Sequence, residues 1–232
     1  MTFKPSQLTG IVLAGGRSRR LGSTQSKLLT RIDGEQILIR IADVLKKITS
    51  ELVLVVRQNQ DDDVLSLGVS LDMRVITDTD PYSGPLAGIH AGLTASTTPF
   101  SFIVAGDHPF ISTNLITAMA MAASHDRVSS PSAVIPQVDG LINPLHAIYP
   151  RDHWIAYFAQ VMSEGETSPR RAIEKAKVAN YPPMTIFTDE DIARTDPHKI
   201  SLFDIDTAEN LSLAKQITEA QIPKGSSNYP MD

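Results

Sequence analysis

The sequence predicts a Rossmann-like α/β fold, a three-layer sandwich around a mostly parallel central sheet. Short β-branched runs alternate with segments of helical periodicity along the 232 residues, as they do in βαβ units. These runs are almost continuously hydrophobic, which is typical of strands buried on both faces. The chain is also long enough to build one large core, and its 42% hydrophobic and 20% charged residues are ordinary for a globular protein.

Seven hydrophobic runs are expected to be the strands of this sheet. They cover residues 10–14, 52–57, 73–77, 100–105, 133–136, 145–149 and 185–187. The helices between them are indicated by periodicity and by capping residues. Apolar residues recur at helical spacing over 37–48. A second helix is expected to begin at Gly84-Pro85, because proline in the first turn loses no hydrogen bond. A third is expected near Ser112, a good N-cap.

The C-terminal part of the chain predicts one more helix and then a tail. Asp206 is expected to cap an amphipathic helix over 207–220. We therefore expect a single domain over residues 1–221 and a loose tail over 222–232. Residues 129–196 are richer in proline, and we expect this portion to recognise a second substrate.

Composition excludes several classes of function. The chain has no cysteine, so disulfides, thiolate zinc sites and cysteine nucleophiles are excluded. A net charge of −5 argues against a broad contact with nucleic acid. No secretory signal is visible, and the longest aliphatic run, 52–56, is too short to span a bilayer, so we expect a cytoplasmic protein. The six histidines lack a metal-binding spacing and are interpreted as structural or surface residues.

The strongest functional signal is a glycine-rich basic loop after the first predicted strand. Gly15 and Gly16 are adjacent, which lets the backbone approach a ligand closely. Successive N–H groups in such a turn bind phosphate oxygens. Four basic residues follow: Arg17, Arg19, Arg20 and Lys27. Because arginine binds phosphate in a bidentate manner and lysine binds it as a point charge, the loop predicts a phosphate site.

The alternative interpretation of this loop is a turn with solvated surface arginines, but four cations beside a glycine pair favour phosphate binding. Neither the dinucleotide pattern G-x-G-x-x-G nor the P-loop pattern G-x-x-x-x-G-K-[ST] is present. A G-x-S-x-G context is also absent around the serines, so a serine hydrolase is not supported.

Four sequence blocks carry a resemblance to a known family. The segment from Leu13 to Gly22, followed by Lys27, resembles the signature loop of the nucleotidyltransferase superfamily that builds NDP-sugars and related adducts. The blocks 76–88, 104–109 and 203–211 resemble further blocks of that superfamily and occur in its order. Within the superfamily the chain resembles the molybdenum cofactor guanylyltransferases. The resemblance covers 10–211 and implies the nucleotide-diphospho-sugar transferase type of fold.

The resemblance implies roles for individual residues. Nucleotide binding falls to Leu13, Ala14, Gly15, Gly16, Arg17, Lys27, Asp78 and Asp107, and catalysis to Lys27, Asp107 and Arg20. Mg²⁺ is implied as the cofactor, bound by Asp107 and Asp206. Asp107 follows an apolar strand and should lie at the carboxyl edge of the sheet, where open α/β sheets bind ligands.

Each of these carboxylates also has a purely structural interpretation. Asp107 could initiate the Gly-Asp-His-Pro turn, and Asp78 could cap a turn instead of contacting the nucleotide. For Asp206 the helix cap is the favoured interpretation, although a cap and a metal contact could use different oxygens. The segment 165–171 is either a second anion site or a helix start with a solvated basic face.

The resemblance implies transfer of GMP from GTP to the terminal phosphate of molybdopterin, with release of pyrophosphate. It also implies transient contacts with other proteins of cofactor biosynthesis or molybdoenzyme maturation. The rivals are transfer from CTP, transfer to a sugar phosphate, and a non-catalytic nucleotide-binding regulator. Gly15 and the block 84–88 favour the guanylyl members, since the cytidylyl relatives typically have Leu-Ala-Ala-Gly and lack that block. One departure is Arg57, near a position where relatives often have a nucleotide-contacting asparagine; Asn59 lies two residues later.

Overall fold

A computed structural model of the chain describes residues 4–14, 26–78, 84–124 and 131–221, and its main feature is an eight-stranded sheet. The strand order is β10-β7-β9-β6-β1-β4-β5, with β8 paired to β7. The strands are β1 (Leu8–Leu13), β4 (Glu51–Val56), β5 (Arg74–Thr77), β6 (Phe100–Ala105), β7 (Ala133–Val138), β8 (Leu141–Ile142), β9 (His146–Pro150) and β10 (Met184–Phe187). All seven predicted strands are confirmed, with bounds that differ by no more than two residues.

The sheet is mostly parallel, as predicted. β1 pairs in parallel with both β4 and β6, and β4 pairs in parallel with β5. β9 is antiparallel to its neighbours β6 and β7. Only residues 139–145 join β7 to β9, whereas a parallel crossover takes about a dozen residues or more. The short connection therefore reverses β9. Among the strands, β8 and a hairpin of β2 (Arg31–Ile32) and β3 (Glu35–Gln36) were not predicted.

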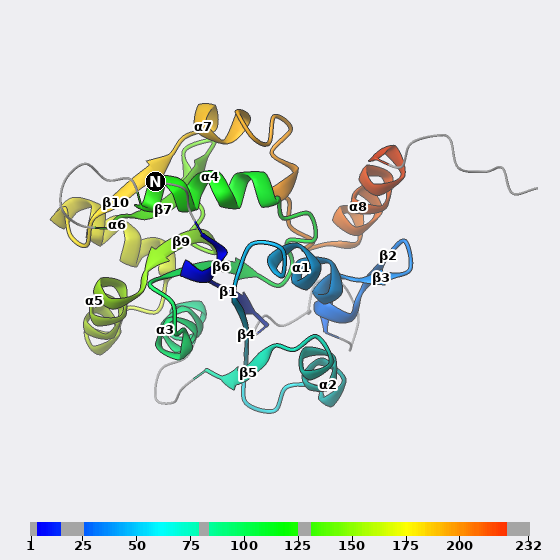
Figure 1. The fold of residues 1–232 in the computed structure, drawn as a ribbon, viewed down its shortest axis with the longest axis horizontal. Coiled ribbons are helices and arrows are strands. Elements are labelled where there is room, and N and C mark those ends of the chain that lie inside the picture. The colour runs from blue at the N-terminus through cyan, green and yellow to red at the C-terminus, as the bar shows by residue number, and fades with distance from the viewer. Residues whose placement is uncertain (1–3, 15–25, 79–83, 125–130, 222–232) are drawn as a thin grey trace, which may run out of the picture.

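Helices cover both faces of the sheet and complete the three predicted layers (Figure 1). Two hydrophobic clusters define these faces. One cluster includes side chains of α1 (Ile37–Leu45), α2 (Asp62–Ser70), α4 (Thr113–Ser124), α7 (Asp189–Ala193) and α8 (Ala208–Gln221). The other includes side chains of α3 (Pro85–Ala95), α5 (Arg151–Ser163) and α6 (Pro169–Ala179). In the described part of the chain no helix is long and apolar enough to cross a membrane.

Alternation along the strands divides the core between the two faces. On β1, Val12 packs into the α1 cluster, whereas the preceding Ile11 packs into the α3 cluster. Both side chains are fully buried because the sheet is covered on both sides. α3 lies very close to the sheet at Gly92, where an added Cβ would be only 2.6 Å from Cγ2 of Ile11. The glycine therefore sets how closely α3 can approach the strands.

The predicted helix starts at the centre of the chain are confirmed. Gly84 precedes α3 with a φ of 103°, which favours glycine, and Pro85 is the first helical residue. Ser112 precedes α4 and accepts a hydrogen bond of 3.4 Å from the backbone N–H of Leu115. Each of these helices follows the carboxyl end of a strand: α3 comes after β5, and α4 comes after β6.

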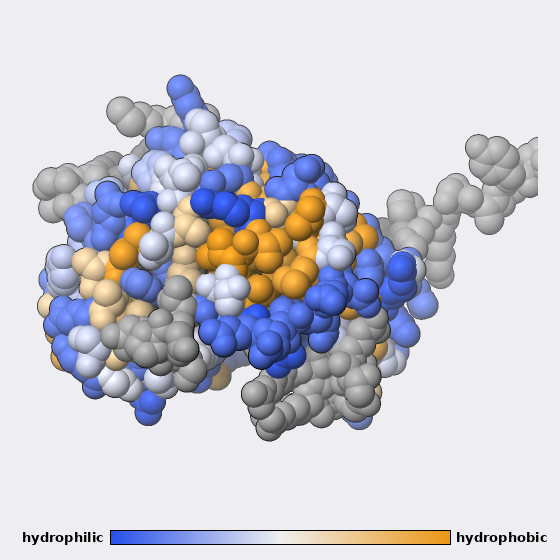
Figure 2. Space-filling view, turned by 90° about the horizontal axis from the view of Figure 1, so that it is seen from below, coloured by the Kyte–Doolittle hydropathy of each residue, from blue (hydrophilic) through white to orange (hydrophobic). Residues whose placement is uncertain are grey.

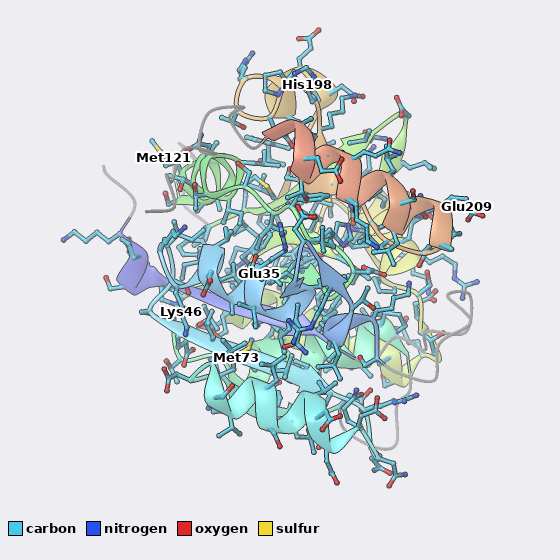
Figure 3. All side chains as sticks on the ribbon, turned by 90° about the vertical axis from the view of Figure 1, so that its right-hand side faces the viewer. Glu35, Lys46, Met73, Met121, His198 and Glu209 are labelled. Carbon is cyan, nitrogen blue, oxygen red and sulfur yellow. The ribbon has the colours of Figure 1, made fainter. Side chains whose placement is uncertain are left out.

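The remaining elements form the rim of the molecule. Figure 3 shows Glu35 of the β2–β3 hairpin at the centre of one side, between α8, which carries Glu209, and α2. β5 forms one end of the sheet order, and its Val75 and Ile76 are only half-buried, while Val69 of the neighbouring α2 is 66% exposed. Figure 2 shows an apolar area on the side of the molecule where β5 and α2 lie. The sheet thus ends on this side with a short strand whose apolar side chains are partly covered.

Candidate active site

A cavity of about 360 Å³ opens at the carboxyl ends of the central parallel strands. Its size is in the range of small-molecule sites in proteins, roughly 300–1,000 Å³. Its lining comes from the ends of β1, β4, β5 and β6, from the start of α3, and from a short 3-10 turn at Lys27–Leu29. The lining residues are Leu13, Ala14, Ser26, Lys27, Leu28, Val55, Asp78, Gly84, Pro85, Gly88, Ala105, Gly106, Asp107 and Leu145. Parallel strands place these distant segments at one edge of the sheet.

The cavity brings together most of the predicted site residues that the structure describes. Leu13, Ala14, Lys27, Asp78 and Asp107 all line it. The predictions for Gly15, Gly16, Arg17 and Arg20 lie outside the described residues. Leu145, which begins the approach to β9, lines the cavity but carries no motif that sequence reasoning could have found.

Gly106 determines how Asp107 meets Lys27. Its backbone N–H donates a hydrogen bond of 3.0 Å to the carbonyl of Leu13 at the end of β1. An added Cβ would be 2.5 Å from Cδ2 of Leu28 and 3.1 Å from the carbonyl oxygen of Leu13. Only glycine allows the chain leaving β6 to lie against both segments. Asp107 therefore emerges beside the turn that carries Lys27.

Lys27 lies between two carboxylates that are far apart in the sequence. Its Nζ is 2.5 Å from Oδ1 of Asp206 and 3.5 Å from Oδ2 of Asp107. The Lys27 side chain is 13% exposed and that of Asp107 is 26% exposed, so this contact is partly shielded from water. Burial by itself raises the pKa of Asp107, but the contact with His108 and the charge of Lys27 outweigh it and lower the pKa below its usual value. Asp107 is therefore an anion at neutral pH.

His108 contacts the same carboxylate from the other side. Its ring is buried, and Nδ1 lies 3.2 Å from Oδ1 of Asp107. The ring centroid is 5.6 Å from that of His146, which is fully buried. The interpretation of the histidines as structural or surface residues therefore missed the contact of His108 with Asp107. The signal in the sequence was its position directly after that aspartate.

The prediction that Asp206 caps the last helix is wrong. α8 begins at Ala208, and the capping residue is Thr207, whose Oγ1 accepts a hydrogen bond of 3.2 Å from the N–H of Asn210. The Oδ1 of Asn210 in turn accepts from the N–H groups of Thr207 and Asp206. The Asp206 carboxylate is thereby left to contact Lys27.

Asp78 also lines the cavity. It is separate from the ion-paired group of Lys27, Asp107 and Asp206, which we call the charged corner. Its backbone N–H donates a hydrogen bond of 2.8 Å to the carbonyl of Val56, which continues the pairing of β5 with β4. Burial raises the pKa of its carboxyl group above the usual value. Apolar side chains from β1 and β4, Leu13 and Val55, also line the cavity, and an added Cβ on Gly88 would be 3.6 Å from Leu13. The cavity therefore combines a carboxylate with a narrow apolar wall.

The departure at Arg57, near a position of doubtful nucleotide contact, lies outside this lining. Arg57 follows β4, but it is not among the residues that line the cavity, and neither is Asn59. Asn59 is exposed and has a left-handed φ of 58°. Neither Arg57 nor Asn59 is therefore positioned on the cavity wall.

The segment before α6 lies at the rim of the cavity. A Cβ on Gly84 would be 3.6 Å from the carbonyl oxygen of Thr167. The buried Glu166 carboxylate accepts hydrogen bonds from the N–H groups of Thr167 and Ser168 and contacts Arg171 and Lys175. The backbone hydrogen bond from Ser168 and these two cations lower the pKa of Glu166 to about 2. Since Glu166 already occupies this helix start, the geometry favours the structural interpretation of the segment over a second anion site at Arg171.

The charged corner fits a hard divalent cation that brings further ligands with it. Among the described residues no three histidine, aspartate or glutamate side chains form a metal site by themselves. The ammonium of Lys27 nevertheless shows that one cation can contact both Asp107 and Asp206. Mg²⁺ is usually bound by one or two carboxylates together with substrate phosphates and water. The donor set is therefore suited to a metal that arrives with a phosphate ligand.

Comparisons with known proteins identify the family of the chain. A family model described as "MobA-like NTP transferase domain" matches residues 10–180. The chain is 30% identical over 219 residues to a Methanosarcina mazei protein described as "Probable molybdenum cofactor guanylyltransferase", covering 90% of each chain. It is 28% identical over 213 residues to the "Molybdenum cofactor guanylyltransferase" of Desulfosudis oleivorans, covering 92% of this chain and 96% of the relative.

Solved structures support the fold. Molybdopterin-guanine dinucleotide biosynthesis protein A from Archaeoglobus fulgidus matches with a TM-score of 0.71 at 21% identity, covering 91% of this chain and 99% of the other. The 2-C-methyl-D-erythritol 4-phosphate cytidylyltransferase from Thermus thermophilus matches with a TM-score of 0.63 at 12% identity, covering 90% and 98%. The family model spans well over half of the chain, so the protein is a nucleotidyltransferase that belongs to the MobA-like NTP transferase domain family.

Proposed function

We propose that the protein transfers GMP from GTP to the terminal phosphate of molybdopterin, forming the guanine dinucleotide cofactor and pyrophosphate. One observation carries this proposal: a single cavity is lined by Lys27 and Asp107, by an apolar wall and by the Asp78 carboxylate. Asp206 is not part of the lining but contacts Lys27. Such a cavity suits a ligand with phosphates at one end and a flat base at the other. The curated relatives named above carry the same activity in their names.

The base would lie against Leu13, Val55 and Gly88. Guanine presents two adjacent donors, N1–H and the N2 amino group, on one edge, and an ionised Asp78 offers two acceptor oxygens. Adenine lacks this pair of donors, so Asp78 would favour GTP over ATP. We therefore assign recognition of the guanine base to the Asp78 carboxylate.

The phosphates would lie toward Lys27, where we also place Gly15, Gly16, Arg17 and Arg20 on the basis of the sequence. Family members generally use a divalent metal, and we propose that here it is Mg²⁺ bound by Asp107 and Asp206. Bound with the triphosphate, it would supply charge neutralisation at the reacting phosphate. Lys27 would hold the triphosphate by its positive charge and align it for attack.

The reaction needs no strong general base. The terminal phosphate of the acceptor carries between one and two negative charges near neutral pH, so one of its oxygens can attack directly. That oxygen forms a bond to the α-phosphorus of GTP while the bond from this phosphorus to the pyrophosphate oxygen breaks. Pyrophosphate leaves with the electron pair. The charged corner therefore acts mainly by alignment and charge neutralisation.

We further propose that residues 1–221 act as one domain, with 222–232 as a tail, and that 129–196 supply most of the acceptor side. β7, β9 and β10 of this portion belong to the same sheet as the strands that form the cavity. Thr167 lies next to Gly84 at the cavity rim. An acceptor bound along this portion would reach the phosphate end of the cavity from the side of α6.

The test is transfer with purified components. The protein, Mg²⁺, GTP and molybdopterin should release pyrophosphate and form a guanine dinucleotide, whereas CTP or a sugar phosphate acceptor should give little product. Product with CTP at the rate of GTP would assign the protein to the cytidylyl rival. If the protein shows nucleotide-dependent thermal stabilisation but no product with any acceptor, it is a non-catalytic nucleotide-binding regulator.

A further inference from the structure

The position of Lys27 raises a question that phosphate binding alone does not answer. Lys27 lines the cavity where the triphosphate would lie. Its Nζ is also 2.5 Å from Asp206 and 3.5 Å from Asp107, the two proposed metal ligands. Without nucleotide, the ammonium and a metal ion would compete for the same carboxylate oxygens.

Electrostatics explains why this arrangement is stable. The side chains of Lys27, Asp107 and Asp206 are 13%, 26% and 40% exposed, so the ammonium and the Asp107 carboxylate are partly dehydrated and the Asp206 carboxylate is more open to water. Like charges in such a place repel each other more strongly than in water. The ammonium of Lys27, in contact with both carboxylates, offsets part of this repulsion. Mg²⁺ would do the same, but it needs carboxylate oxygens at roughly 2.0–2.1 Å and gives up its water reluctantly.

The local backbone allows Lys27 to serve in two places. Leu28, the next residue, is buried and packs beside Gly106, which holds the turn against the end of β1. Lys27 itself lines the cavity, as does Asp78. Its long unbranched side chain can therefore exchange the carboxylates for a phosphate by rotation about side-chain bonds.

We propose that Lys27 is the resident counter-cation of the metal site in the nucleotide-free enzyme. Its ammonium takes the place of the metal between Asp107 and Asp206, and the arriving triphosphate draws it away and brings the metal in. This inference rests on the proposed metal–triphosphate site. It implies that the metal binds weakly alone and much more tightly with nucleotide, and that each ligand strengthens the other by the same factor.

The test measures metal binding without nucleotide. Mn²⁺ is titrated by electron paramagnetic resonance into the wild-type protein, Lys27→Met and Lys46→Met. Lys46 follows α1, is exposed and is labelled in Figure 3, so its variant is the matched control for loss of one positive charge. Lys27→Met should bind Mn²⁺ on the order of tenfold more tightly than the wild type, because a competing charge at close range is gone. Lys46→Met should bind like the wild type.

A second substitution tests whether the increase in Mn²⁺ affinity comes from the Asp107–Asp206 pair. Adding Asp206→Asn to Lys27→Met removes one of the two carboxylates and should abolish most of the increase in Mn²⁺ affinity. GTP should also strengthen Mn²⁺ binding less in Lys27→Met than in the wild type, since there is no ammonium left to displace. Lys27→Gln, which keeps a polar side chain of similar length, should show the same increase and serves if the Met variant does not fold.

Equal or weaker nucleotide-free Mn²⁺ binding by folded Lys27→Met or Lys27→Gln would overturn the inference. The titration is independent of the transfer reaction. If the wild type forms no guanine dinucleotide but the Lys27 variants still bind Mn²⁺ more tightly, the counter-cation role stands and the assigned reaction is wrong. If the wild type transfers GMP and the variants show no increase, only the counter-cation role is wrong.

Discussion

Replacing Asp78 by asparagine tests both the stability and the specificity assigned to the cavity. The substitution keeps the size of the side chain and removes its charge. The backbone N–H of Asp78 bonds to Val56 at 2.8 Å in the β4–β5 pairing, and this contact does not depend on the side chain. Asp78→Asn should therefore leave the strand in place while changing only the chemistry that faces the ligand.

The two expected effects have opposite signs. Loss of a charge-assisted hydrogen bond to guanine costs about 1.5–3 kcal/mol, which corresponds to roughly 10- to 150-fold weaker GTP binding. Without nucleotide the variant should be more stable at pH 7. Burial raises the pKa of Asp78 in the folded chain, so ionisation of this carboxyl costs stability above both its folded and unfolded pKa values and costs nothing below them. The extra stability of Asp78→Asn over the wild type should therefore shrink as the pH falls through the folded and unfolded pKa values of Asp78.

The assay is titration calorimetry of GTP, ATP and pyrophosphate, together with thermal unfolding at several pH values. GTP binding should weaken, whereas binding of ATP and pyrophosphate should change little. Asp72→Asn is the matched control, because Asp72 is exposed and lies before β5 at the end away from the cavity. Its left-handed φ of 57° is one that asparagine tolerates. This control should bind GTP like the wild type.

Two results would refute the reasoning on Asp78. An equal loss for GTP, ATP and pyrophosphate would place Asp78 with the phosphates or the metal, and guanine would have to be recognised elsewhere. Unchanged GTP binding, with only the stability affected, would leave Asp78 as a buried carboxyl group without a part in the site.

Three further predictions concern the metal site, the far end of the sheet and α3. Asp107→Asn should reduce metal-dependent transfer far more than ligand-free thermal stability, and the reverse would favour a turn-forming role. Burial raises the pKa of Glu51, but hydrogen bonds from Thr9 and others lower it overall, so this carboxylate should stabilise the fold above its unfolded pKa and lose that effect as the pH falls through its folded pKa. Urea unfolding of Glu51→Gln should thus show a deficit of about 1–3 kcal/mol at pH 7 that disappears in acid; a deficit independent of pH would contradict this. Gly92→Ala should destabilise the protein by about 1–3 kcal/mol, because its Cβ would be 2.6 Å from a β1 methyl group. Gly88→Ala, one turn earlier with its nearest contact at 3.6 Å, should keep the stability but weaken nucleotide binding, and equal unfolding of both variants would refute the packing argument.

Much of the fold follows from residues that are neighbours in the sequence. The hydrophobic runs at β1, β4 and β6 predict buried strands because every side chain in them must find an apolar environment on one face or the other. Gly84-Pro85 and Ser112 predict helix starts because a cap is completed within a few residues. The direction of β9 was harder to predict, since it depends on the short connection after β7 and on which strand it pairs with.

The sequence by itself determined the α/β class, the strands, and the motifs that place Lys27, Asp78 and Asp107 at one edge of the sheet, because each depends on local patterns and on the direction of parallel strands. Only the tertiary structure decided the partner of Asp206. The residue that caps α8 is Thr207, one position after the predicted Asp206. The folded chain instead places the Asp206 carboxylate against Lys27, 179 residues earlier. No local pattern encodes a contact between side chains so far apart, because it depends on how the end of the chain packs across the completed sheet.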